Sequence, residues 1–357
     1  MGKLVEKIVF GQFALIAEIG VNYYDIAMQR GISNMEAAKL MCSEAALAGC
    51  CAVKFQTYKA ETLASRDSPA YWDTSEESTT SQYELFRKFD SFGELEYREL
   101  ASYCETIGVD FLSTAFDFES ADYLESFMDI YKVSSSDLTN LPFIEYQALK
   151  GKPMIISVGA GELDEMRTAV KTVRGVNSQP LVLCHCVLEY PTPYEHANLR
   201  RILSLKEEFP DLIIGYSDHC KPDDSYDVIK TAYTLGAHVV EKHFTLDKSL
   251  PGNDHYHAMD PEDVRAIVKG IDHIEELLGN STLEFSETES AARLNARRSI
   301  VAAQDIPKGT RIVRDMLTFK RPGTGISPNK IDEVIGAYAA LSIPEDSVLQ
   351  EEMLEQC

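Results

Sequence analysis

The chain has 357 residues, of which 45% are hydrophobic, and a formal net charge of −23 at pH 7. This length fits one large domain with a small one, or two of ordinary size, and the hydrophobic fraction supplies a sizeable core. The negative charge argues against a nucleic-acid partner, because such a protein would release few counterions from a phosphate backbone. An anionic substrate would therefore need cations that are concentrated at its own site.

The N-terminal residues 1–7 lack the apolar core of a signal peptide, and no apolar run approaches the length of a membrane span. The eight cysteines form no CxxC pair and no disulfide-like framework. Several of them lie in apolar runs, as reduced thiols do in the cytosol. We therefore predict a cytoplasmic protein with no membrane partner.

Apolar runs of strand length alternate along the chain with stretches of helical periodicity. We expect strands at 13–19, 52–57, 110–116, 131–135, 153–158, 181–186, 212–217 and 238–244. Helical patterns between them include 35–47, 95–106, 162–173 and 197–208. Most of the strand runs are continuously apolar, which is typical of parallel strands buried on both faces. Eight such units predict an α/β fold closed as a (β/α)8 TIM barrel. The alternative is a doubly wound open sheet, which the lack of a Gly-rich loop after the first strand disfavours.

The pattern changes after a last helix at 261–278. Residues 281–293 are polar and acidic and are predicted to form a linker between a barrel domain at 1–280 and a small domain at 294–357. The small domain reads as short strands and turns with a helix at 327–335, and it buries little core alone. The insertion 64–89 contains Trp72, lacks a clear period and is predicted to be a loop over the barrel mouth.

Two short motifs, at 215–219 and 241–247, each follow a strand-like run. Side chains alternate along a strand, so Ser217 and His219 share one face, as do Glu241 and His243. Two neighbouring strands that end in histidine on the same side form half of a metal site. We predict His219 and His243 as ligands of a divalent ion; the alternative is two hydrogen-bonded histidines at the rim.

Chemistry in such barrels takes place at the carboxyl ends of the strands. Polar residues stand at each of the predicted ends: Glu18, Lys54, Gln56, Ser113, Thr114, Lys132, Ser135, Ser157, His185, Ser217, Asp218, His219, Glu241 and His243.

Lys54 and Lys132 end short strands and should point into the barrel mouth, where a buried lysine requires an anion. With hydroxyl donors nearby, they favour binding of a phosphate or carboxylate. The predicted donors are Ser135, Ser157 and Ser217. A Schiff-base nucleophile and snorkelling to solvent remain the alternatives.

Carboxylates also stand near the mouth. Glu18 closes the first strand and Asp137 follows the fourth, and either could act as a general base or orient a hydroxyl. Asp254 lies in a turn-forming stretch after the eighth strand, where His255 and His257 are interpreted as local loop residues.

These residues match a known pattern. The matching motifs are Ala-Glu-Ile-Gly-Val-Asn at 17–22, Val-Lys-Phe-Gln-Thr at 53–57, Leu-Ser-Thr at 112–114, Tyr-Lys-Val-Ser-Ser at 131–135, His-Cys at 185–186, Tyr-Pro-Thr-Pro at 190–193, the motifs at 215–219 and 241–247, Arg-Ser at 298–299 and Lys-Arg-Pro-Gly-Thr-Gly at 320–325. Through their order and placement the chain resembles the sialic acid synthase family over nearly its whole length. That family couples a (β/α)8 barrel to a C-terminal antifreeze-like (SAF) domain.

The resemblance implies a condensation of phosphoenolpyruvate with an open-chain N-acetylated amino sugar to a nine-carbon 2-keto acid, with release of phosphate. It assigns His219 and His243 to a divalent metal, Mn²⁺ before Mg²⁺ or Co²⁺. It also implies a domain-swapped homodimer in which Arg321 reaches the N-acyl end of the sugar on the partner. The resemblance assigns the other site residues to two groups. Lys54, Lys132, Ser135, Ser157 and Ser217 would bind phosphoenolpyruvate, while Glu18, Gln56, Asp137, Tyr190 and Asp254 would place the sugar and manage protons.

The chain departs from the family pattern at Asn22-Tyr23-Tyr24-Asp25, at Ala115, at Asp137 and at Val158. These departures leave the sugar open between N-acetylmannosamine, our first choice, and the diacetamido precursors of legionaminic or pseudaminic acid. Two other hypotheses are a Schiff-base sialic acid lyase and a non-catalytic carbohydrate-binding protein.

Overall fold

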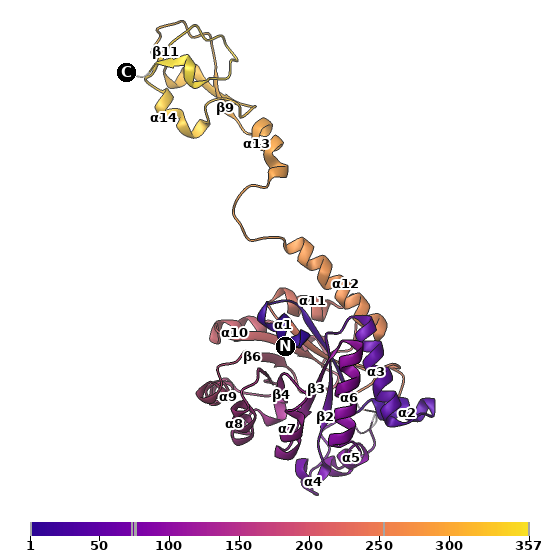
Figure 1. The fold of residues 1–357 in the computed structure, drawn as a ribbon. Helices are drawn as coiled ribbons and strands as arrows, with labels where there is room; N and C mark the ends of the chain where they lie inside the picture. Colours follow the sequence, from indigo (N-terminus) through magenta and orange to yellow (C-terminus); the bar gives the residue numbers. More distant parts are fainter. Residues whose placement is uncertain (1, 73, 75–76, 253, 356–357) are drawn as a thin grey trace. The chain divides into compact units, whose positions relative to one another are not determined.

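The computed structural model describes residues 2–72, 74, 77–252 and 254–355. The chain divides into two compact units, Met1–Gly279 and Asn280–Cys357 (Figure 1). Within the described residues, no helix has both the length and the apolar character needed to cross a membrane.

A closed parallel barrel forms the first unit, and this confirms the predicted (β/α)8 fold. Each strand pairs with the next in sequence, and β1 also pairs with β8 to close the ring. The strands are β1 (Ala14–Gly20), β2 (Ala52–Thr57), β3 (Asp110–Ala115), β4 (Tyr131–Val133), β5 (Met154–Ser157), β6 (Leu181–Cys186), β7 (Ile213–Asp218) and β8 (Val239–His243).

Helices surround the barrel and cover its outer face. They are α2 (Tyr23–Arg30), α3 (Asn34–Ala48), α4 (Ala60–Leu63), α5 (Gln82–Lys88), α6 (Glu94–Ile107), α7 (Phe118–Leu124), α8 (Leu141–Leu149), α9 (Leu163–Val176), α10 (Arg201–Glu208), α11 (Asp227–Thr234) and α12 (Pro261–Leu278). The start of α3 shows how the sequence sets such a helix: the Ser33 hydroxyl accepts from the Glu36 amide, and the Glu36 carboxylate accepts from the Ser33 amide.

The hydrophobic core has two parts. One lies between the strands and the outer helices. The other fills the barrel interior, where Leu4, Val5 and Ile8 of helix α1 (Lys3–Val9) pack with Ala14 and Ile16 near the start of β1. Helix α1 therefore closes the amino-terminal end of the barrel with apolar side chains.

Most predicted elements lie within one to three residues of their observed bounds, but two differ for a clear reason. The fourth strand ends at Val133 and continues as the 3-10 turn η1 (Ser135–Asp137), so Ser135 is not in the strand. The helix predicted at 197–208 begins only at Arg201, after the 3-10 turn η2 (Tyr194–His196). Asn198 has φ 47° in between, and the left-handed region cannot continue a right-handed helix.

The insertion 64–89 is not a simple loop, because its last part forms α5 and an antiparallel bridge joins Pro69 to Ser81. Trp72 is buried, and its Nε1 donates to the carbonyls of Glu77 and Thr79 at 3.2 and 3.1 Å. Residues 73 and 75–76 of this insertion lie outside the described part of the chain.

The second unit has its own small core, which contains Ile300, Ile312, Ile343 and Leu349. Its elements are η3 (Glu287–Glu289), α13 (Ser290–Ala296), β9 (Ser299–Ala302), η4 (Arg314–Met316), β10 (Leu317–Lys320), η5 (Pro328–Lys330), α14 (Ile331–Val334), β11 (Tyr338–Ala339), η6 (Glu351–Met353) and β12 (Leu354–Glu355). The stretch 281–293, expected to be a plain linker, therefore contains η3 and the start of α13, while 327–335 forms η5 and α14.

Candidate active site at the carboxyl end of the barrel

A cavity of about 490 Å³ opens at the carboxyl ends of the strands. Most of the predicted site residues line it: Glu18, Lys54, Gln56, Lys132, Ser135, Asp137, Ser157, Tyr190, Ser217, His219 and His243. Asp254 lines an adjoining cavity of about 360 Å³, which shares Gln56, Tyr190 and His243 with the first. Arg321 lies in the second unit.

Two buried lysines meet two buried carboxylates in the mouth. Lys54 Nζ forms an ion pair with Glu18 and lies 3.7 Å from Glu241 Oε1. Lys132 Nζ lies 3.7 Å from the same Glu241 oxygen. Thr114 Oγ1 accepts from Lys54 at 3.1 Å, and Glu18 accepts from Gln56 Nε2 at 3.0 Å. The cations are thus held in place by acidic neighbours.

These contacts set the protonation of the mouth. Burial raises the pKa of Glu18 from 4.5 to about 7, although Lys54 opposes the change. Burial disfavours the charged form of Glu241 too, but Lys132 and Lys54 outweigh it and lower the Glu241 pKa. Burial acts against protonated Lys54, yet Glu18 and Glu241 raise its pKa above 10.5. Lys54 is therefore a fixed cation and Glu18 can exchange a proton near neutral pH.

The predicted serines differ in their partners. Ser217 Oγ donates to Glu241 Oε1 at 3.4 Å, and Ser135 Oγ accepts from the Gly159 amide at 2.9 Å. The buried Ser157 Oγ has no hydrogen-bond partner among the described residues. A buried hydroxyl without a partner is available to a ligand.

Asp137 lines the cavity, and its side-chain hydrogen bonds to described residues stay within its own turn. Its carboxylate accepts from Asn140 Nδ2 at 3.1 Å and from the Ser134 hydroxyl at 3.5 Å. Burial raises its pKa above 3.8. These local contacts connect Asp137 to neither lysine.

His219 and His243 lie together, with ring centroids 5.6 Å apart. Val187 carbonyl oxygen lies 2.7 Å from His219 Nδ1, which leaves Nε2 of this ring as its ligand atom. The Tyr190 ring packs on His219 with a centroid distance of 4.1 Å. The two predicted metal ligands are therefore adjacent, and the Val187 carbonyl and the Tyr190 ring fix the orientation of the His219 ring.

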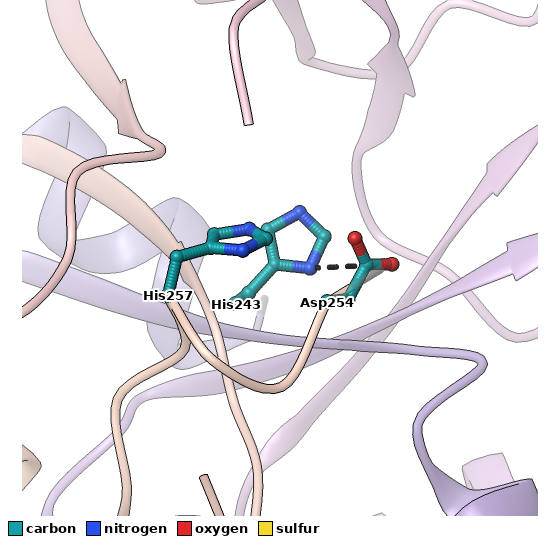
Figure 2. A group of neighbouring side chains, drawn as sticks. All are labelled: His243, Asp254 and His257. Atoms are coloured by element: carbon teal, nitrogen blue, oxygen red, sulfur yellow. Dashed lines mark ion pairs between the residues drawn. The ribbon is translucent and has the colours of Figure 1, made fainter. Parts of the chain in front are cut away.

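A third histidine joins this group. One potential ligand atom from each of His243, Asp254 and His257 lies within 4.8 Å of the others (Figure 2). Asp254 Oδ2 is 3.8 Å from His243 Nδ1, and the His257 ring centroid is 4.9 Å from that of His243. Burial, and then nearby positive groups, lower the pKa of both rings well below 6.5. Both imidazoles are therefore neutral, which is the form that binds metal.

Comparison with known proteins adds independent findings. The model of the NeuB family matches residues 41–282, and that of the SAF domain matches residues 297–355. The chain belongs to the NeuB family. It is 36% identical to N,N'-diacetyllegionaminic acid synthase of Legionella pneumophila, over 96% of this chain and 94% of that protein. It is 32% identical to human N-acetylneuraminate-9-phosphate synthase, over 96% and 92% of the two chains.

A solved structure gives the same picture. The N-acetylneuraminic acid synthetase of Leptospira borgpetersenii, in complex with citrate, is 29% identical and superimposes with a TM-score of 0.67, covering 79% of this chain and 90% of that one. These matches confirm the resemblance found in the sequence, including the SAF domain. The NeuB-family chain is thus an enzyme of the sialic acid synthase type.

Some predicted strand-end residues of this NeuB-family enzyme point away from the mouth. His185 Nε2 lies 2.7 Å from the carbonyl of Ala197, on the outside of the barrel, and Ser113 Oγ bonds to Thr57. Asp218 forms a buried ion pair with Lys242 at 2.6 Å. The reason is strand alternation, because each follows or precedes a residue that faces the mouth.

Three further mouth residues, to which the sequence assigned no role, contact the predicted site residues. Glu241 connects the two lysines, Thr114 bonds Lys54, and Cys186 lies 3.9 Å from His219 Nδ1. Glu241 could have been found, because it shares a strand face with His243. His257 carried no such signal, since its place depends on how the loop after β8 returns to the barrel.

Proposed function

We propose that the enzyme condenses phosphoenolpyruvate with an open-chain N-acetylated amino sugar. The product is a nine-carbon 2-keto acid, and phosphate is released. One observation carries the proposal: a single cavity places the buried Lys54, Lys132 and a set of serines beside the buried pair of His219 and His243. The first half suits an anion, and the second suits a divalent ion that would polarise a carbonyl group.

The anion half would bind phosphoenolpyruvate. Lys54 and Lys132 offer fixed positive charge for its phosphate and carboxylate, since Glu18 and Glu241 keep their ammonium groups in position. Ser135, Ser157 and Ser217 line the same cavity and supply hydroxyl donors. The unpartnered Ser157 hydroxyl loses nothing when it turns to a ligand oxygen.

The residues of the histidine half fit a divalent metal, which we propose to be Mn²⁺. A ligand nitrogen lies about 2 Å from its metal, so two rings on one ion have centroids about 4.5–6.5 Å apart. The His219–His243 centroid separation of 5.6 Å falls in this range. When bound there, the ion would polarise the sugar aldehyde as a Lewis acid.

The groups around this centre would transfer protons and orient the sugar. A bond forms between C3 of phosphoenolpyruvate and the aldehyde carbon, and the aldehyde oxygen gains a proton. Water adds to C2, the bond between C2 and the phosphate oxygen breaks, and C2 becomes a ketone. The two protons of the water thus end on the new hydroxyl and on the released phosphate. Glu18, with a pKa of about 7, can take the proton of that water. Burial raises the pKa of Tyr190 well above 10, so its hydroxyl remains a donor. Gln56 and Tyr190 line both cavities, and Asp254 lines the adjoining one. These three side chains would hold the sugar.

The protonation of Lys54 argues against a Schiff-base lyase at this residue. An amine nucleophile needs a lowered pKa, whereas Glu18 and Glu241 raise that of Lys54. Burial alone would have acted in the opposite direction. We therefore favour an electrostatic role for Lys54.

N-acetylmannosamine is the first proposed acceptor, and one observation favours a second. The adjoining cavity beside His243 and Asp254 has a wall of aromatic and aliphatic side chains. They are Tyr58, Tyr71, Trp72, Leu85, Phe86 and Phe89. Such a wall would accommodate the methyl group of a diacetamido-trideoxyhexose of the legionaminic type, while Asp25, Glu77 and Lys88 give the same cavity a polar side. We also propose a domain-swapped homodimer in which Arg321 of a second copy contacts the N-acyl group.

Phosphate release tests the proposal directly. The enzyme is incubated with phosphoenolpyruvate and each of a panel of N-acetylmannosamine and diacetamido-trideoxyhexoses, and the product mass is measured. We expect sugar-dependent phosphate release that EDTA abolishes and Mn²⁺ restores. Full activity in chelator would overturn the metal part, and no turnover of any panel member would overturn the acceptor class.

A further inference from the structure

Two histidines of the loop after β8 are fully buried but differ in their contacts. His255 Nδ1 lies 2.7 Å from Thr245 Oγ1, and its Nε2 lies 3.2 Å from Asp25 Oδ2. His257, two residues later and 0% exposed, has no hydrogen-bond partner at either ring nitrogen among the described residues. The interpretation of both as local loop residues therefore fits His255 and leaves His257 unexplained.

A buried imidazole with two unpartnered nitrogens is unfavourable, because it loses its hydrogen bonds to water and gains none in exchange. What surrounds His257 is mainly other rings. Its centroid lies 4.9 Å from that of His243, 6.2 Å from that of His219 and 5.8 Å from that of Tyr190. The His243 Nδ1 beside it is also buried, and no hydrogen bond reaches it from the described part of the chain.

The backbone fixes His257 beside the strand end. The Met259 amide donates to the His243 carbonyl at 2.7 Å, and the Thr245 amide donates to the Met259 carbonyl at 3.0 Å. The loop therefore returns to the end of β8 and pairs with it. This pairing holds the loop's side chains against the site with little freedom, as a binding centre requires.

We propose that His257 is a further protein ligand of the metal, acting with His243 and Asp254. This inference rests on the metal centre of the proposed function and extends it beyond the His219–His243 pair. One ligand atom from each of the three residues meets within 4.8 Å, and Figure 2 shows the His257 ring against the His243 ring, with Asp254 on the Nδ1 side of His243. The three histidine centroids, 4.9 to 6.2 Å apart, all suit one ion.

A third imidazole changes what the site prefers. Imidazole nitrogen suits Fe²⁺ and Zn²⁺, whereas carboxylate and water suit Mn²⁺ and Mg²⁺, and the affinity of such a site rises from Mn²⁺ to Co²⁺. A centre with His219, His243, His257 and the Asp254 carboxylate should bind the later metals much more tightly than Mg²⁺. It should also keep its ion in the absence of substrate.

Metal affinity tests the inference without using activity. The apoenzyme is titrated with Mn²⁺ and Co²⁺ by calorimetry, comparing wild type, His257→Ala and His238→Ala. His238 is the control, because it is a partly buried histidine just before β8, at the opposite end of the barrel, whose Nδ1 also lacks a hydrogen-bond partner among the described residues. We expect His257→Ala to weaken binding at least about 10-fold, as loss of even an outer partner of a metal ligand does, and His238→Ala to leave it unchanged.

Pulsed EPR of the Mn²⁺-loaded proteins supplies a second measurement, since it counts the imidazole nitrogens coupled to the ion. We expect the count to fall by one in His257→Ala, provided that circular dichroism shows the variant folded. Unchanged affinity and nitrogen count in the folded variant would overturn the inference while leaving the metal-dependent function intact. A wild type that binds no metal would overturn both. A variant that fails to fold is replaced by His257→Phe, which fills the site without a ligand atom and is judged by the same two measurements.

Discussion

Replacing Glu18 by glutamine should remove a pH dependence of folding that arises in the barrel mouth. Glu18 is 2% exposed, and burial raises its pKa from 4.5 to about 7 against the opposing charge of Lys54. Between these two values the folded chain binds more protons at this site than the unfolded chain does. The stabilising contribution of protonated Glu18 is therefore complete below pH 4.5 and is lost as the pH rises through about 7.

The size of the effect follows from the change in pKa. One pKa unit corresponds to about 1.4 kcal/mol. The pKa of Glu18 rises from 4.5 in the unfolded chain to about 7 in the folded chain. The free energy of unfolding should therefore fall by about 3 kcal/mol between pH 4 and pH 8, relative to a chain without this carboxyl. Glu18→Gln keeps the shape of the side chain and cannot ionise, so it should lack this term.

Urea unfolding of the apoenzyme in chelator, at several pH values from 4 to 8, measures the difference. Glu36→Gln is the control, because hydrogen bonds from Ser33 lower the pKa of Glu36 and its effect should have the opposite sign. In activity, the acid limb of kcat/KM near pH 7 should disappear in Glu18→Gln, with a rate loss of about 10²–10⁴-fold for a general base. Parallel stability curves for wild type and Glu18→Gln would refute the reasoning.

Two further predictions concern the strands and the second unit. Lys242→Met should cost about 3–5 kcal/mol in urea unfolding, because it leaves Asp218, 2% exposed, as an unpaired buried charge. Lys150→Met, which breaks partly exposed pairs, should cost less than about 1 kcal/mol, and equal losses would contradict the argument. The proposed swapped dimer predicts that Arg321→Ala protein loses turnover and regains it when mixed with His219→Ala chains, as measured by phosphate release. Absence of recovery after verified subunit exchange would exclude a site shared between subunits.

The sequence by itself determined the barrel and much of its mouth. The continuous apolar runs predicted strands buried on both faces, and two of them, β2 and β6, have the predicted bounds. Period-two alternation then placed His219 on one face with Ser217, and His243 on one face with Glu241. Both inferences use only short-range geometry, since a strand repeats every two residues whatever surrounds it.

Only the tertiary structure decided which polar residues meet. His185 and Asp218 point outward, because side chains alternate along a strand and each of these residues is next to one that faces the mouth. The ion pairs around Glu241 required the register of three separate strands. His257 reaches His243 because the loop pairs back onto the end of β8, a long-range contact that composition and local spacing do not encode. Local periodicity thus sets the elements, whereas closure of the barrel and return of its loops assemble the chemistry.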